Sequence, residues 1–247
     1  MNIFTAAFLG LVQGITEFLP VSSSAHLVFF QHILPGFSQT GVLFDILLHV
    51  ATTLAVIFYF RKTLFDLTFR EIVLLGVGTI PAAVVGILFR KHLEGLFSSV
   101  FWAGITLAIS GVLNILVDRA KTTRERVTLF DSVLIGIAQA IAIIPGISRS
   151  GSTIFTGVAL GIDRKKVAQY SFLLSIPAIL GASAVEVLSH GFDTQGSLGA
   201  YILGAVVAGV TAYFSINFLL NTLSTKKYRY FGYYAIVVGL FAAFFIK

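Results

Sequence analysis

Six stretches of this chain are apolar over lengths that suit a bilayer crossing, and this feature limits the fold more than any other. They lie at roughly 41–60, 72–89, 99–117, 167–188, 198–223 and 231–246. Only 11% of the 247 residues are charged, whereas a soluble domain carries about 25%. The runs lack the alternating ten-residue segments of a membrane barrel. We therefore predict an all-α, polytopic integral membrane protein with a single membrane domain, residues 1–247.

Two other apolar regions, roughly 3–34 and 132–161, are each interrupted near the middle by a polar stretch that contains proline. The interruptions read FLPVSSSAH and IIPGISRSGST. Each half is near a dozen residues, short of the about 20 that a spanning helix needs. Backbone that breaks at membrane depth must be buried in protein or line a wet cavity. We therefore predict two re-entrant helix–break–helix hairpins, although two full crossings each would leave the downstream topology unchanged.

The basic residues indicate which side of this threading is cytoplasmic. Of the 17 lysines and arginines, 13 fall on one side and 3 on the other, and Arg149 lies inside the second break. Basic loops stay in the cytoplasm, so the first side is cytoplasmic. The net charge of +6 is then a topology signal, and no nucleic-acid partner is expected. The chain has no cysteine, which excludes thiol catalysis, cysteine metal sites and disulfides.

The two interrupted regions align at a fixed offset of 126 residues without a gap. The matched identities are Gly10 with Gly136, Gln13 with Gln139, Ser22 with Ser148, and Ser24 with Ser150. Each unit would hold one hairpin and three spans, and an odd number of spans inverts the second unit relative to the first. We predict inverted repeats over roughly 1–120 and 127–247, with a site between them near the midplane.

The first interrupted region carries polar groups that are costly at membrane depth. Gln13 and Glu17 share one helix face and supply oxygen ligands, and an intramembrane carboxylate is usually functional. Pro20 ends the helix, and the serines of 22–24 are candidates to cap the next one. His26 falls in the first turn of that second helix.

The second interrupted region repeats the pattern with a cation in it. Pro145 and Gly146 break the chain, Ser148 and Ser150 are the candidate caps, and Arg149 lies between them. Two helix N-termini would thus point into one buried place, each with free N–H donors and about half a positive charge. Such ends bind phosphate, and a guanidinium adds a bidentate fork for phosphate oxygens.

The extra negative charge of Glu17 indicates a divalent cation at this place. A diphosphate ester carries about two to three negative charges near neutrality. A carboxylate beside it makes sense if a cation lies between them, and hard oxygen ligands favour Mg²⁺ or Ca²⁺. Zn²⁺ is disfavoured because a single histidine and no cysteine are near.

Each of these residues also has a plain structural interpretation. Gln13 could join two helices, the serines could only cap, and His26 could be a satisfied core histidine. Asp45 and His49, one turn apart in the next span, could support the site or form a packing pair.

The segments QGITEFLPVSSSAH, from Gln13 to His26, and PGISRSGST, from Pro145 to Thr153, resemble the two signature regions of the bacterial undecaprenyl-diphosphate phosphatases, the BacA/UppP type. The resemblance covers essentially the whole chain. Gln13 stands at a position where the pattern has Glu or Gln, and Ala25 stands where many members have Gly. The resemblance implies removal of the terminal phosphate of undecaprenyl diphosphate, which supplies the lipid carrier for peptidoglycan synthesis and confers bacitracin resistance.

The resemblance also implies a divalent cation and a location in the plasma (inner) membrane, with the site facing the periplasm. We expect catalytic roles for Glu17, Ser23, His26 and Arg149 and cation ligands in Glu17 and Gln13. The expected phosphate-binding residues are Ser22, Ser24, Gly146, Ser148, Ser150 and Thr153. The expected partners are the lipid diphosphate and the bilayer, and a homodimer is left open.

Three routes to hydrolysis are open at this point, and so is a rival function. The nucleophile could be Ser23 activated by His26, His26 itself, or metal-activated water with His26 as general base. A polyprenyl-phosphate flippase would need the same anion site but neither the metal ligand nor the histidine.

Overall fold

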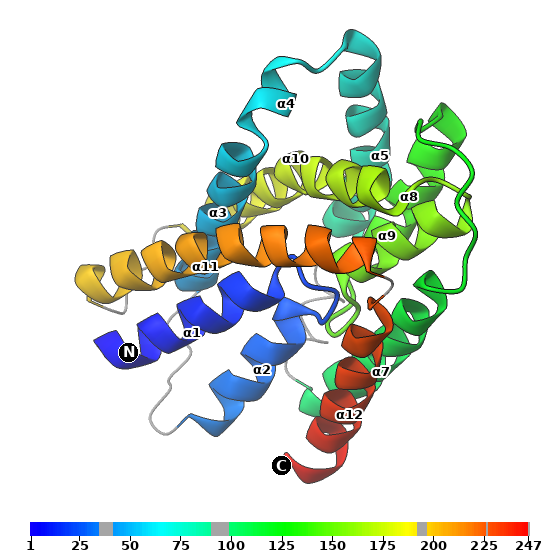
Figure 1. Ribbon diagram of the computed structural model, residues 1–247. Helices are drawn as coiled ribbons and strands as arrows, with labels where there is room; N and C mark the ends of the chain where they lie inside the picture. The colour runs from blue at the N-terminus through cyan, green and yellow to red at the C-terminus, as the bar shows by residue number, and fades with distance from the viewer. Residues whose placement is uncertain (35–41, 90–98, 192–196, 226, 247) are drawn as a thin grey trace.

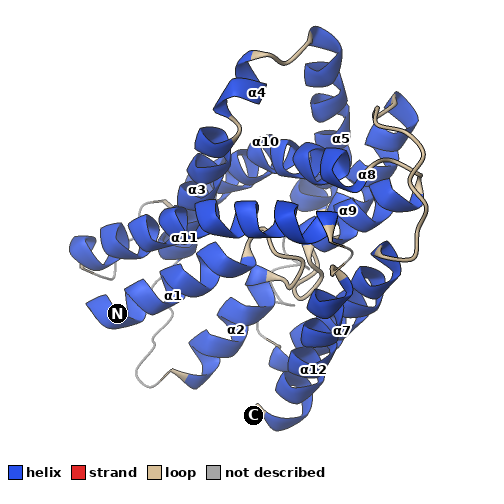
Figure 2. Ribbon diagram, viewed as in Figure 1, coloured by secondary structure: helices blue, strands red, loops and turns tan. Residues whose placement is uncertain are grey.

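The computed structural model describes residues 1–34, 42–89, 99–191, 197–225 and 227–246, and this part of the chain is built from helices (Figures 1 and 2). All six predicted spans are helical. They are α3 (Val42–Tyr59), α5 (Phe69–Leu88), α7 (Val100–Val117), α10 (Arg164–His190), α11 (Leu198–Ser224) and α12 (Arg229–Phe245). Four of them, α5, α7, α10 and α11, are long and apolar enough to cross a membrane, and α3 and α12 are shorter apolar helices. The chain is an all-α, multi-pass membrane protein.

The two interrupted regions form pairs of short helices that meet at a break. The first pair is α1 (Ile3–Thr16) and α2 (Ser23–Ile33), and the second is α8 (Leu129–Ile141) and α9 (Arg149–Ala159). Figure 1 shows that both breaks lie in the interior of the bundle, surrounded by the longer helices. The helix–break–helix geometry that the sequence predicts is therefore present at both places.

Residues related by the offset of 126 make matching contacts between helices. Helix α1 packs on α11, and its counterpart α8 packs on α5. A Cβ added to Gly10 would collide with the carbonyl of Gly204, and a Cβ added to Gly136 would collide with the carbonyl of Gly78. Gly10 corresponds to Gly136 and Gly78 corresponds to Gly204 at that offset. Each short helix is therefore seated by the same close backbone approach to a helix of the other unit.

The loop after α7 gathers several of the basic residues at one end of the molecule. Arg164 donates to three backbone carbonyls at the end of α7 and in this loop, at 3.1–3.2 Å. The backbone N–H of Arg229 donates to Asp118 at 2.9 Å. Arg124 donates to both oxygens of Asp131, at 2.5 and 2.7 Å. The starts of α8, α10 and α12 therefore meet at one end, as the threading of the basic residues requires.

Candidate active site between the two hairpins

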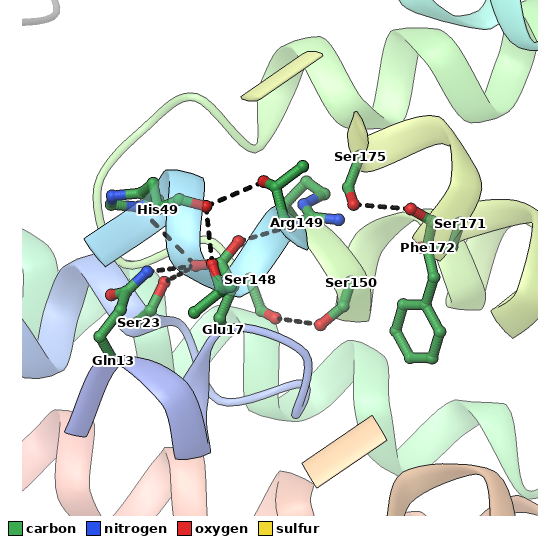
Figure 3. Close-up of polar contacts among 12 residues, drawn as sticks. Gln13, Glu17, Ser23, His49, Ser148, Arg149, Ser150, Ser171, Phe172 and Ser175 are labelled. Carbon is green, nitrogen blue, oxygen red and sulfur yellow. Dashed lines mark hydrogen bonds and ion pairs between the residues drawn. The ribbon is translucent and has the colours of Figure 1, made fainter. Parts of the chain in front are cut away.

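The site is organised around the carboxylate of Glu17, at the C-terminal end of α1. This side chain is 6% exposed. Its Oε1 accepts a hydrogen bond from Arg149 Nη2 at 2.5 Å. Its Oε2 accepts from Ser23 Oγ at 2.7 Å and from Gln13 Nε2 at 2.9 Å (Figure 3). The predicted carboxylate, hydroxyl and guanidinium therefore meet in one buried cluster.

Ser23 and Arg149 reach this carboxylate from equivalent places in the two hairpins. Each is the first residue of the helix after a break, Ser23 in α2 and Arg149 in α9. The offset of 126 relates the two positions. Both helices therefore present their first side chain to Glu17, at the end where free N–H groups carry positive potential.

The first break is held in an unusual backbone conformation. Ser22 has φ +62° and is the single non-glycine residue with positive φ in the described ranges. Its Oγ accepts from the backbone N–H of Ala25 at 3.4 Å, as the predicted cap should, and lies 3.1 Å from Ser24 Oγ. The carbonyl of Pro20 accepts from Asn114 Nδ2, an α7 side chain, at 2.5 Å.

The second break reaches a similar shape with ordinary backbone at its cap. Ser148 has φ −70° and accepts from the backbone N–H of Gly151 at 3.1 Å. The positive φ of this break falls on Gly146, at +91°, where a residue without Cβ adopts it at little cost. Pro145 is held through its carbonyl, which accepts from the hydroxyl of Thr106 at 2.5 Å.

The two breaks also contact each other. The backbone N–H of Gly146 donates to Ser24 Oγ at 3.4 Å, and Ser150 Oγ donates to the carbonyl of Leu19 at 3.2 Å. The hydroxyl of Thr153 lies 2.6 Å from the hydroxyl of Ser171 on α10. The hydroxyls of Ser150 and Thr153 are therefore engaged with other groups of the protein and help to hold the breaks in place.

A cavity of about 760 Å³ opens beside this cluster. Of the predicted residues, it is lined by Glu17, Ser22, Ser23, Ser24, Ser148 and Arg149. Apolar side chains from both hairpins and from α10, such as Leu27, Ile143 and Ile179, form other parts of its wall. The cavity thus joins a polar end, which suits a phosphate group, to an apolar wall, which suits a hydrocarbon chain.

His26 does not line this cavity. Its Nδ1 lies 2.8 Å from the carbonyl oxygen of Ser22, and its Nε2 lies 2.9 Å from Tyr234 Oη on α12. The imidazole and the Tyr234 ring are nearly parallel, with the centroids 5.7 Å apart and an interplanar angle of 3°. The histidine that faces the cavity is His49, whose Nε2 is 3.7 Å from Glu17 Oε2.

The cavity has lining residues that the sequence interpretation left out. Gln31 of α2 and Glu186 of α10 are among them, and Gln31 Nε2 donates to Asp45 at 3.2 Å. A signal was present, because Gln31 follows Ser24 and Leu27 at helical spacing and therefore shares their face. Following the same helical spacing along α2 would have added Gln31 to the predicted site.

The oxygen atoms of Gln13 and Glu17 are donors of the kind that a divalent cation such as Mg²⁺ prefers. Gln13 Oε1 is buried without a hydrogen-bond partner, and the Glu17 carboxylate lies beside that amide. Within the described ranges, no three His, Cys, Asp or Glu side chains cluster closely enough to hold a metal ion by themselves. Magnesium in phosphate sites commonly takes one or two carboxylates and fills its remaining positions with phosphate oxygens and water, so the donors fit such an ion.

Comparison with known proteins agrees with this geometry. Residues 6–241 match the family described as bacitracin resistance protein BacA. An undecaprenyl-diphosphatase of Halothermothrix orenii is 40% identical over 97% of this chain and 96% of its own length. An undecaprenyl-diphosphatase of Carboxydothermus hydrogenoformans is 39% identical over the same shares, and one of Methanococcus vannielii is 38% identical over 96% and 98%. This chain belongs to the BacA bacitracin resistance protein family.

Proposed function

We propose that this protein is an undecaprenyl-diphosphate phosphatase, which hydrolyses the lipid diphosphate to the lipid monophosphate and inorganic phosphate. The names of its relatives and the chemistry of its cavity support the same reaction. The observation that carries the proposal is the convergence of Ser23 and Arg149, from two helix N-termini, on the Glu17 carboxylate.

The cavity suits both parts of such a substrate. Two helix N-termini and one guanidinium surround its polar end, and Arg149 Nη1 is buried without a partner in the described structure. A diphosphate supplies acceptors for these donors. The apolar wall would take the first part of the polyprenyl chain, while the rest of the chain stays in the bilayer.

Ser23 is the nucleophile that the geometry favours. Its hydroxyl already donates to Glu17 at 2.7 Å, so the carboxylate can accept the proton as Ser23 Oγ bonds to the terminal phosphorus. The bond from that phosphorus to the bridging oxygen breaks, and the lipid monophosphate leaves. Water then attacks the phosphoserine and releases phosphate. Arg149 and the α2 and α9 amides would stabilise the charge on the transferred group.

The remaining predicted residues would support this chemistry in different ways. Ser22, Ser24 and Ser148 line the cavity near the phosphate, while Gly146, Ser150 and Thr153 would maintain the shape of the breaks. Glu17 and Gln13 would hold a divalent cation, Mg²⁺ or Ca²⁺, which would offset the charge of the diphosphate. All these residues come from one chain, so a homodimer is not needed to complete the site.

We infer that the cavity opens toward the outer face of the plasma membrane. The basic residues gather around the start of α10, whereas the cavity is lined by Ile179 and Glu186 in the second half of this helix. The positive-inside rule places the basic end in the cytoplasm. The inverted-repeat arrangement predicted from the sequence fits this placement, with the site between the units at depth.

The test is phosphate release from undecaprenyl diphosphate by the purified protein in detergent, with Mg²⁺ or with EDTA. We expect release with Mg²⁺, loss of release in EDTA, and loss in Glu17→Gln protein that elutes as the wild type does. Wild-type protein that releases no phosphate across metals and chain lengths would contradict the proposal. Movement of polyprenyl phosphate across vesicles without phosphate release would then indicate a flippase.

A further inference from the structure

His26 lies one turn after the proposed nucleophile Ser23, and a role for it rests on the proposed phosphatase function. We propose that His26 is a positioning residue that fixes the strained turn before Ser23, and that Tyr234 of α12 holds its imidazole in the required tautomer. Neither side chain then exchanges a proton with the substrate. The proposal assigns a role to a tyrosine 208 residues away in sequence.

The tautomer of His26 follows from its two contacts. The carbonyl of Ser22 can only accept a hydrogen bond, so the Nδ1 that lies 2.8 Å from it carries the proton. In a neutral ring, Nε2 then has a lone pair, which accepts the hydroxyl of Tyr234 at 2.9 Å. Both ring nitrogens are therefore engaged, and the side chain is buried, with 4% relative exposure.

The turn that this contact fixes is the strained one. Ser22 has φ +62°, a region that costs a non-glycine residue free energy unless surrounding contacts hold it. Its carbonyl accepts from both the backbone N–H of His26, at 3.4 Å, and the imidazole. The next residue is Ser23, whose hydroxyl must point at Glu17. Fixing the Ser22 carbonyl therefore sets the direction in which α2 starts and presents its first side chain.

The second hairpin supports the same interpretation. Ser152 stands at the position equivalent to His26, and its hydroxyl is buried without a partner in the described structure. The preceding cap, Ser148, has φ −70° and carries no such strain. The imidazole contact thus occurs in the hairpin that has the strained cap and is missing from the hairpin that does not.

The kinetic test separates a positioning role from a chemical one. Asparagine keeps an N–H close to the place of Nδ1 but has no basic nitrogen. We expect His26→Asn to keep kcat within about tenfold of wild type, and His26→Ala to lose clearly more. Tyr234→Phe keeps the ring but loses the hydroxyl, so kcat should fall about two- to tenfold, the kinetic equivalent of one hydrogen bond, with KM nearly unchanged.

Two results would overturn the proposal. One is His26→Asn protein that is as inactive as His26→Ala, and the other is Tyr234→Phe protein with wild-type kcat. If His26 acted as a general base, losing the hydrogen bond from Tyr234 would leave its Nε2 free to act, and Tyr234→Phe would keep wild-type kcat. Elution volume and thermal unfolding in detergent identify variants that are merely misfolded.

A spectroscopic readout tests the tautomer without using activity. In protein labelled with ¹⁵N-histidine, the signals lost in His26→Asn identify this ring. We expect a protonated Nδ1 and an unprotonated Nε2 near neutral pH. A ring protonated at Nε2, alone or as imidazolium, contradicts the proposal even if phosphate release is never observed. Conversely, the expected tautomer in a protein that releases no phosphate would place the failure in the proposed function.

Discussion

The two hairpins share a backbone plan but differ in chemistry at three matched positions. Both contain a helix, a proline-containing break and a serine-capped second helix, and both pack a glycine against a glycine of the other unit. The matched differences are Glu17 and Ile143, Ser23 and Arg149, and His26 and Ser152. The first hairpin therefore supplies the carboxylate and the hydroxyl, and the second supplies the guanidinium. The shared backbone arrangement brings two helix N-termini together, and the side chains that differ give each hairpin a separate chemical role.

The hairpins also differ in where they store strain. Ser22 takes φ +62°, whereas the second break places its positive φ on Gly146. A non-glycine residue in such a conformation costs about 1–3 kcal/mol, and functional sites are where this cost is commonly found. The strained hairpin is the one that carries the proposed nucleophile.

Among the changes that compare the two hairpins, the largest effect on stability is expected from Arg149→Ala, which removes the cation of the second hairpin. Glu17 would be left buried without its ion-pair partner, a change that costs about 3–5 kcal/mol. Loss of a donor to the transferred phosphate should lower turnover at least about 10²-fold. Thermal unfolding and phosphate release in detergent measure the two effects. Arg149→Lys keeps the positive charge without the bidentate guanidinium, so its stability and turnover should lie between those of wild type and Arg149→Ala. Wild-type turnover in Arg149→Ala would contradict the role proposed for the second hairpin.

A smaller and equal effect is expected from Gly10→Ala and Gly136→Ala. In both, the new methyl group would collide with a backbone carbonyl of the facing helix, and overpacking of this kind costs about 1–3 kcal/mol. Gly181→Ala is the control, because its Cβ would meet nothing within 4 Å. Unfolding in detergent should place the first two variants together and the control at or above wild type. Strongly unequal losses would show that the matched contacts are not equivalent.

The smallest effect is expected on stability, when the two cap residues Ser22 and Ser148 are replaced by alanine or by glycine. Replacing either serine by alanine removes a cap, whereas glycine costs only a few tenths of a kcal/mol as a cap. At Ser22, glycine also relieves the positive φ, which is worth about 1 kcal/mol. The stability gap between the Gly and Ala variants should therefore be larger by about 1 kcal/mol at Ser22 than at Ser148. Equal gaps at the two sites would show that Ser22 is not strained.

The helices were predictable because hydrophobicity and helix breakers are local signals. The predicted span 99–117 became Val100–Val117, and both breaks fall at their prolines. Helix α10 begins at Arg164, three residues before the apolar span at 167–188, because Asp163 caps it by accepting from two backbone N–H groups. The short helix α4 (Arg61–Phe65) had no such signal in a polar turn and was missed.

Several of the residues that meet around Glu17 were predictable from the sequence, but their contacts were not. The face shared by Gln13 and Glu17 follows from helical spacing, and the structure joins them by a hydrogen bond. The pairing of Arg149 with Glu17 spans 132 residues and depends on how the two units pack. The direction in which the His26 side chain points depends on the backbone angle φ of Ser22, and the spacing of residues in the sequence does not reveal that angle.

If Ser23 receives the phosphoryl group beside Glu17 and Arg149, phosphate release must depend on its hydroxyl, and Ser23→Ala tests this. The matched control is Ser152→Ala, which removes a buried hydroxyl that has no partner in the described structure. We expect the control to keep turnover within about twofold, because an unpartnered hydroxyl contributes little. Ser23→Ala should lose about 10³-fold or more, as removal of a nucleophile does. Monodisperse Ser23→Ala protein that keeps more than about a tenth of wild-type turnover would contradict the claim.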